Sequence, residues 1–135
     1  MTIRPGGDVD ALLDADALLR LASEHASNTG CQRCAALRCP GWEALSSTVD
    51  ERVLRKLGSL GVPGDEEPTL EEYHPQGTNY WSPQAPIAPA FHPYNRCELW
   101  ACVGCGRPFL RYTEYGGYYV EPRIRELRTE PIVGG

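Results

Sequence analysis

The N-terminal part of the chain carries apolar residues at helical spacing. Between residues 8 and 27 they recur every three or four positions and are interrupted by aspartates. Asp8 or Asp10 supplies an N-cap, and Gly30 marks the end. The pattern predicts a helix with one buried face, preceded by a loose arm over residues 1–7. The positions that define this face are Leu12, Leu19, Ala22 and Ala26.

A second apolar stripe lies between residues 47 and 60. Ser47 or Thr48 is the expected N-cap, with Asp50 or Glu51 following in the manner of a capping box. The sequence therefore predicts a second helix here, after a short helical piece over residues 41–45. The stripe consists of Val49, Val53, Leu54, Leu57 and Leu60, with Gly58 and Gly61 at its end.

Residues 61–96 differ in kind from the segments before them. Seven of the chain's twelve prolines lie here, which argues against regular structure. The segment is also rich in aromatic residues, which disordered linkers usually lack. We therefore expect a long ordered loop that wraps over the core, and loops of this length are often functional.

The pattern changes again from residue 97 onward, where it favours antiparallel strands over 97–101, 107–115 and 118–123. Gly116 and Gly117 form a two-residue hairpin signal, because a type I′ turn needs positive φ at both central residues. In that register Glu114 faces Tyr119. The predicted fold is a single α+β domain over residues 1–135, with two N-terminal helices packed on a small C-terminal antiparallel sheet. Its parts are the arm 1–7, a helical part 8–60, the loop 61–96 and a β part 97–130.

Composition and charge narrow the possible functions. Hydrophobic residues make up 41%, enough for a modest core, and no apolar run approaches the roughly 20 residues of a membrane span. The net charge of −5 comes from residues 1–96, whereas residues 97–135 hold five basic and five acidic residues. Neither part has the basic footprint of a nucleic-acid binder. The arginines and glutamates of the C-terminal part indicate an ordinary mixed surface. The N-terminus has no secretory signal, so we expect a cytoplasmic protein.

Six cysteines carry the clearest chemistry in the chain. In a reducing compartment they indicate metal binding more often than disulfides. Cys31 and Cys34 form one C-x2-C pair, and Cys102 and Cys105 form another. Two such pairs supply the four ligands of a tetrahedral site. We therefore predict one shared metal site made by these four thiolates.

The second pair lies in the sequence Trp100-Ala-Cys-Val-Gly-Cys-Gly-Arg-Pro-Phe109, which resembles the knuckles of zinc ribbons and rubredoxins. The resemblance covers about ten residues at each pair. It implies zinc in a ribbon-like site, with iron as the alternative. The first pair departs from the pattern, because it follows a helix and no glycine comes after Cys34. The Trp-x-Cys-x-x-Cys-Gly hairpin also resembles those of small bacterial accessory and toxin-immunity proteins.

Other polar candidates leave alternatives open. Cys39 and Cys97 are buried thiols, ligands of a second metal together with His92, or a redox pair. His25, near the first pair, is a further candidate ligand. His74 and His92 are general-base candidates, although each is more often a hydrogen-bonded loop histidine.

These observations favour a non-enzymatic protein with a structural zinc and a protein partner. Tyr, Trp and Arg are enriched at protein–protein interfaces, and an aromatic set in the loop and sheet supplies such residues. A zinc-ribbon nucleic-acid binder and a metal-dependent or redox enzyme are the alternatives. A closed site of four thiolates argues against catalysis at the metal. The oligomeric state is left open. The aromatic set is Tyr80, Trp81, Tyr94, Trp100, Tyr112, Tyr115, Tyr118 and Tyr119.

Overall fold

The molecule is built around one mixed β-sheet. The structure, a computed structural model, describes residues 12–28, 30–46, 48–60, 69–115 and 120–133. Within these ranges the sheet has six strands in the order β1-β3-β4-β5-β6-β2, in which β1 and β3 are parallel and all other pairs antiparallel. The elements are β1 (Leu12–Leu13), α1 (Ala15–Glu24), β2 (Glu43–Ala44), β3 (Leu54–Leu60), β4 (Glu98–Cys102), β5 (Pro108–Glu114) and β6 (Glu121–Glu126), with 3₁₀ turns at Ala35–Leu37, Glu51–Val53 and Tyr94–Arg96.

The prediction of two N-terminal helices on a small sheet is wrong. The segment expected to form the second helix is strand β3, which pairs with β4. A bulge between Lys56 and Gly58 adds one residue to β3, so Leu54 and Leu60 lie on opposite faces of the sheet. Leu54, Leu57 and Leu60 are three residues apart, a spacing that suits one face of a helix. In β3, however, Leu54 packs in one core and Leu57 and Leu60 pack in the other. Asp50, expected only as the second member of a capping box, is itself the N-cap of the 3₁₀ turn that precedes β3.

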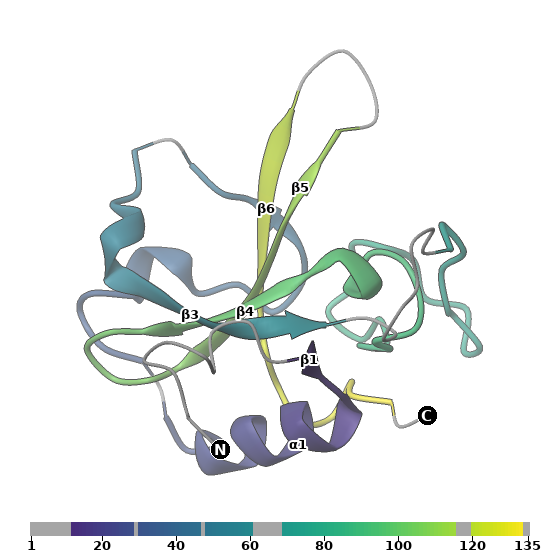
Figure 1. The fold of residues 1–135 in the computed structure, drawn as a ribbon, viewed down its shortest axis with the longest axis horizontal. Coiled ribbons are helices and arrows are strands. Elements are labelled where there is room, and N and C mark those ends of the chain that lie inside the picture. The colour runs from purple at the N-terminus through teal and green to yellow at the C-terminus, as the bar shows by residue number, and fades with distance from the viewer. Residues whose placement is uncertain (1–11, 29, 47, 61–68, 116–119, 134–135) are drawn as a thin grey trace, which may run out of the picture.

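The first predicted helix is present in a shorter form. Its N-cap is Asp14, whose side chain accepts a 2.9 Å hydrogen bond from the N–H of Ala17. The predicted caps Asp8 and Asp10 lie outside the described residues. Leu12 and Leu13 form β1 rather than a first helical turn, because β3 offers them a parallel partner. Leu18 and Ala22 are the buried residues of α1, and α1 lies along one side of the sheet (Figure 1).

Both faces of the sheet are covered, so the molecule has two cores. Cross-strand neighbours point to the same face, and Leu99 opposite Leu110 therefore belongs to one core while Trp100 opposite Phe109 belongs to the other. The first core joins the sheet to α1 and contains Leu18, Ala22, Trp42, Leu60, Ile87, Tyr94, Cys97, Leu99, Leu110, Tyr112 and Leu127. The second contains Cys34, Leu37, Cys39, Leu45, Leu54, Cys102, Phe109 and Ile124.

The described part of the proline-rich loop packs against the first core. Ile87 forms a parallel bridge with Ile132, and its side chain is fully buried. Arg125 of β6 is also fully buried. Its guanidinium donates 2.9 Å hydrogen bonds to the carbonyls of Pro83 and Ala85 and a further bond to the Tyr94 hydroxyl. A buried arginine thus holds the loop where an exposed charge was expected.

Strands β5 and β6 form a hairpin that extends beyond the rest of the sheet (Figure 1). Glu114 pairs with Glu121, so the predicted pairing of Glu114 with Tyr119 is wrong by two residues. At the base of the hairpin the register places Leu110 opposite the buried Arg125. The two glycines of the predicted turn lie outside the described residues. Within the described ranges, no helix has both the length and the apolar character needed to cross a membrane.

Candidate metal centre

The four cysteines of the two C-x2-C pairs come together at one point. All four sulfur atoms lie within 4.8 Å of one another. The Sγ atoms of Cys31 and Cys102 are 3.5 Å apart, and those of Cys34 and Cys105 are 3.8 Å apart. A tetrahedral ion with metal–sulfur bonds of about 2.3 Å requires sulfur–sulfur distances of about 3.8 Å. The group therefore has the dimensions to hold a metal ion.

The second pair is held by the main chain of a hairpin. Cys102 is the last residue of β4, and its N–H donates to the carbonyl of Arg107 at 2.9 Å. The N–H of Gly106 donates back to the carbonyl of Cys102 at 2.8 Å. The N–H of Gly104 points at the Cys102 sulfur at 3.3 Å, a contact that stabilises a thiolate. Gly106 has a φ of +83°, which glycine adopts without strain.

The first pair lies in a loop and has no strand partner. The N–H of Cys31 donates to the sulfur of Cys34 at 3.3 Å, and the 3₁₀ turn Ala35–Leu37 follows. Downstream, Cys39 and Glu126 join the loop to β6, since the N–H of Glu126 donates to the Cys39 carbonyl at 3.1 Å. This pair is thus positioned by contacts on either side of it.

The two thiols of the first pair have different pKa values. Desolvation raises the pKa of Cys34 to about 12. A backbone hydrogen bond from Cys34 is the main influence that lowers the pKa of Cys31 to about 7. At neutral pH, without metal, Cys34 therefore keeps its proton, and a metal that binds there must displace it.

Asn28 links the two knuckles to α1, and the sequence analysis did not single it out. Its side-chain amide donates to the carbonyl of Cys105 at 3.2 Å and lies 3.0 Å from Nδ1 of His25. Its Oδ1 accepts from the N–H of Gly30 at 2.8 Å. His25 consequently contacts the centre through Asn28 and is not one of the four clustered residues. An Asn two residues before a glycine is typical of a turn, but no sequence signal connects it to a cysteine 77 positions away.

Glu126 is a second residue whose role the sequence did not reveal. Its carboxylate accepts bonds from Arg38 Nε at 2.7 Å, Arg107 Nη2 at 2.6 Å and the N–H of Cys39 at 2.8 Å. Burial alone would raise the pKa of Glu126, but the two arginines outweigh it and the pKa lies below its usual value. Arg107, Glu126 and Arg125 were expected on a mixed surface, and all three are buried.

Cys39 and Cys97 belong to different cores, on opposite faces of the sheet. The thiol of Cys39 donates to the carbonyl of Leu37 at 3.1 Å, and that of Cys97 to the carbonyl of Pro93 at 3.3 Å. Burial raises the pKa of Cys39 to about 12 and the pKa of Cys97 well above its usual value. This geometry forms neither a redox pair nor a second metal site from them and matches the buried-thiol alternative.

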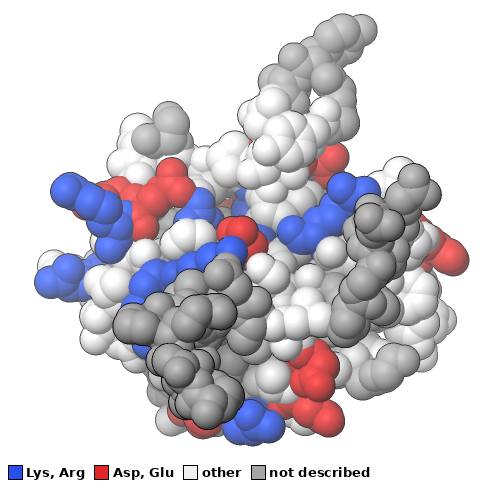
Figure 2. Space-filling view, viewed as in Figure 1, with Lys and Arg blue, Asp and Glu red and all other residues white. Residues whose placement is uncertain are grey.

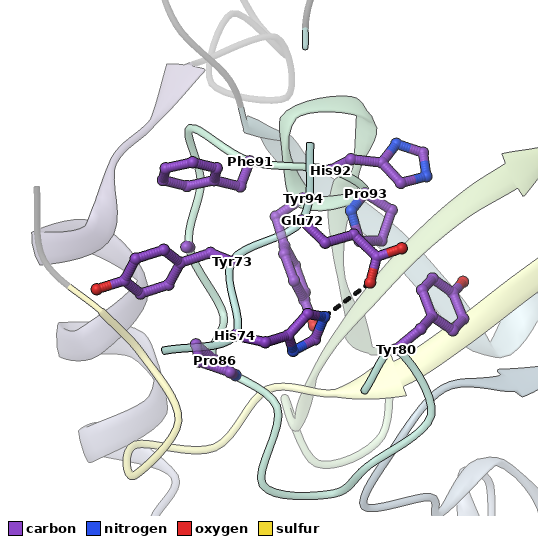
Figure 3. Close-up of a pocket in the computed structure, with 10 residues that line it drawn as sticks. Glu72, Tyr73, His74, Tyr80, Pro86, Phe91, His92, Pro93 and Tyr94 are labelled. Atoms are coloured by element: carbon purple, nitrogen blue, oxygen red, sulfur yellow. Dashed lines mark hydrogen bonds and ion pairs between the residues drawn. The ribbon is translucent and has the colours of Figure 1, made fainter. Parts of the chain in front are cut away.

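The two candidate catalytic histidines lie beside a small cavity (Figure 3). His74 bonds Glu72 through Nε2 and Thr78 through Nδ1, both at 2.7 Å, so its ring is held on both sides. The ring of His92 points away from this pair (Figure 3). The cavity measures about 10 Å³, which is room for roughly one water molecule. It offers no space for a substrate.

The aromatic residues divide between core and surface. Trp42 contacts the rings of Tyr80, Tyr94 and Tyr112 inside the first core. Trp81 is 52% exposed and lies under the guanidinium of Arg123, at 4.8 Å. Tyr115 and Val120, the described residues that flank the hairpin tip, are 72% and 59% exposed. Figure 2 shows blue basic and red acidic side chains interspersed on the face it presents.

No protein-family model, curated protein or solved structure matches the chain. The fold and the centre define its class, a mixed β-sheet domain with a four-cysteine group that could hold a metal ion. The geometry of the centre therefore carries the functional argument.

Proposed function

We propose that this protein binds one zinc ion through Cys31, Cys34, Cys102 and Cys105, and that the ion is structural. The observation that carries the proposal is the convergence of four sulfur atoms from two distant segments within 4.8 Å. The ion would join the loop of the first pair to the β4–β5 hairpin. In a domain of this size, such a link supplies free energy that a small core lacks.

Zinc is preferred over iron for a general chemical reason. Four thiolates in tetrahedral geometry suit both metals. A closed site with no open coordination position serves a structural role, which zinc fills without redox chemistry. Iron in the same four thiolates would instead make the protein an electron carrier, and the metal test below separates the two.

The proposed role is to bind another protein through the exposed aromatic surface beside the β5–β6 hairpin. Its exposed apolar residues are Trp81, which stacks on the guanidinium of Arg123 in β6, and Tyr115 and Val120, which flank the hairpin tip. Exposed Trp and Tyr residues beside an arginine are typical of interface anchors. The interspersed charges of Figure 2 support a protein partner over a nucleic acid, whose phosphates select a basic stripe.

Six free thiols support the further proposal that the protein works in the reducing cytoplasm.

Elemental analysis of the purified protein tests the metal centre. We expect one zinc per chain, lost in Cys31→Ser and in Cys102→Ser. Cys39→Ser and Cys97→Ser are the matched controls, because these thiols lie outside the four-sulfur group and should leave the zinc in place. One iron per chain and a red colour would replace zinc by an electron-transfer site. A chain without metal would overturn the proposal.

The partner role has its own test. Affinity capture with the wild type should retain a partner that Trp81→Ala and Tyr115→Ser lose, while Leu70→Ser, another exposed apolar residue (69%), retains it. Titration with DNA and RNA at low salt should show no binding. Tight, salt-dependent binding there would favour the nucleic-acid alternative.

A further inference from the structure

A polar cleft lies next to the four-cysteine group. It has a volume of about 550 Å³, within the range typical of small-molecule sites. Its walls come from the end of α1 and the residues after it, the residues after the first knuckle, Arg107 beyond the second knuckle, and the end of β6 with the residues that follow it. The side chains that could contact a ligand are His25, Asn28, Arg38, Arg107 and Arg128.

The cleft has more positive than negative charge. Three arginines line it, against Glu126 and Glu130. The Glu126 carboxylate already accepts from Arg38, Arg107 and the Cys39 N–H. Glu130 is exposed. Arg38 and Arg107 therefore bond the same carboxylate. The third arginine, Arg128, is exposed, as Glu130 is.

Arg107 is the buried member of this set. Its side chain is only 10% exposed, and its Nε has no hydrogen-bond partner among the described residues. One of its Nη atoms donates to the Asn28 carbonyl and the other to Glu126. Glu126 compensates the charge of Arg107, but the cleft as a whole is lined by three arginines and two glutamates. This excess of positive charge, together with the unpartnered and buried Nε of Arg107, points to an anionic ligand.

We propose that this cleft binds a small organic anion through a phosphate or carboxylate group. Arg128 and Arg38 contact the anion at the mouth, and Arg107 supplies positive charge from the floor. Planar guanidinium groups match both kinds of oxyanion. The volume leaves room for the rest of the ligand beside His25 and Asn28. This site is separate from the proposed structural zinc and partner surface, and its proposal does not depend on either of them.

Titration of the metal-loaded protein with inorganic phosphate and, separately, with succinate tests the proposal. Both are run at constant ionic strength, followed by calorimetry and by the NMR signals of the Asn28 side-chain amide. We expect saturable binding of at least one probe with shifts at Asn28. The tighter probe identifies the ligand group.

Charge variants localise the site. Arg128→Ala should weaken binding by about tenfold, the loss of one charge-assisted hydrogen bond, and Arg128→Glu should abolish it. Arg55→Glu is the matched control, since Arg55 is exposed on β3 and does not line the cleft. Metal content, measured on the same samples, distinguishes failure of this site from failure of the zinc proposal. Absence of saturable binding, or equal weakening by Arg55→Glu, would overturn the proposal.

Discussion

The two knuckles supply the same pair of ligands but are built in different ways. Cys102 and Cys105 lie at the turn between β4 and β5, where main-chain bonds between Cys102 and both Gly106 and Arg107 close the loop. Cys31 and Cys34 lie in a loop anchored mainly by the side chains of Asn28 on one side and Glu126 on the other, with one main-chain bond from the Glu126 N–H to the Cys39 carbonyl. The hydrogen bonds of the β4–β5 hairpin form the second knuckle, whereas side chains from elsewhere in the chain hold the first knuckle beside it.

This difference teaches which half of the centre depends on the metal. Hairpin bonds exist whether or not an ion is bound, so the second knuckle is preorganised. The first knuckle would be fixed to the second only when an ion joins its sulfurs to those of Cys102 and Cys105. Metal binding should therefore order one knuckle much more than the other.

Metal removal has the largest expected effect. A ligand that binds only the folded state stabilises by about 4 kcal/mol when its free concentration is about 1,000 times Kd. Chelation should thus lower the free energy of unfolding by about that amount in chemical denaturation. Hydrogen exchange should show lost protection over residues 28–39 and retained protection over 98–113. Equal loss in both segments would contradict the asymmetry.

Glu126→Gln tests the anchor on the C-terminal side of the first knuckle. Removing one member of a buried ion-paired group costs about 3 kcal/mol. Because the folded pKa of Glu126 is lowered, its contribution is present above the ordinary pKa of about 4.3 and is lost as pH falls through the folded value.

The difference in unfolding free energy between wild type and Glu126→Gln should accordingly shrink below about pH 4. Glu121→Gln is the control, since the side chain of Glu121 is 26% exposed in its pair with Arg123. Its loss should stay below about 1 kcal/mol. A pH-independent difference for Glu126→Gln would show that the carboxylate charge does not matter.

Asn28→Ala tests the anchor on the N-terminal side. The variant removes the donor to the Cys105 carbonyl and the acceptor for the Gly30 N–H. We expect a loss of about 1–2 kcal/mol in unfolding free energy and faster release of zinc to a chelator. Asn79→Ala, which removes an exposed bond to the Trp81 N–H, should leave zinc release unchanged. Equal release rates in both variants would exclude this role for Asn28.

Gly104→Ala has the smallest expected effect and probes the contact between the knuckles. An added Cβ would lie 3.0 Å from the Cys31 sulfur and 2.9 Å from Cδ of Arg33. The arginine can move, but a metal-bound sulfur cannot, so metal affinity should fall by about fivefold, or about 1 kcal/mol. Gly77→Ala meets no atom within 4 Å but has a φ of +80°. It should lower unfolding free energy by about 1 kcal/mol and leave metal affinity unchanged.

Much of the centre could be anticipated from local spacing. The C-x2-C pairs and the glycines around Cys105 indicate which sulfurs can share an ion, and the structure places those four together. Strands over 97–101 and 107–115 were also predicted, and they correspond to β4 and β5. Strand β3 was not, because the bulge at Gly58 converts strand alternation into a spacing that imitates a helix.

The sequence by itself determined which residues could together hold a metal ion, since ligand type and local spacing are properties of a few neighbouring residues. Only the tertiary structure decided what surrounds that chemistry. It buried Arg107 with Glu126 and Arg125 with the loop carbonyls, it placed Cys39 and Cys97 in separate cores, and it set Asn28 against Cys105. Such contacts join residues far apart in the chain, and the local pattern around either partner does not indicate which distant residue it will meet.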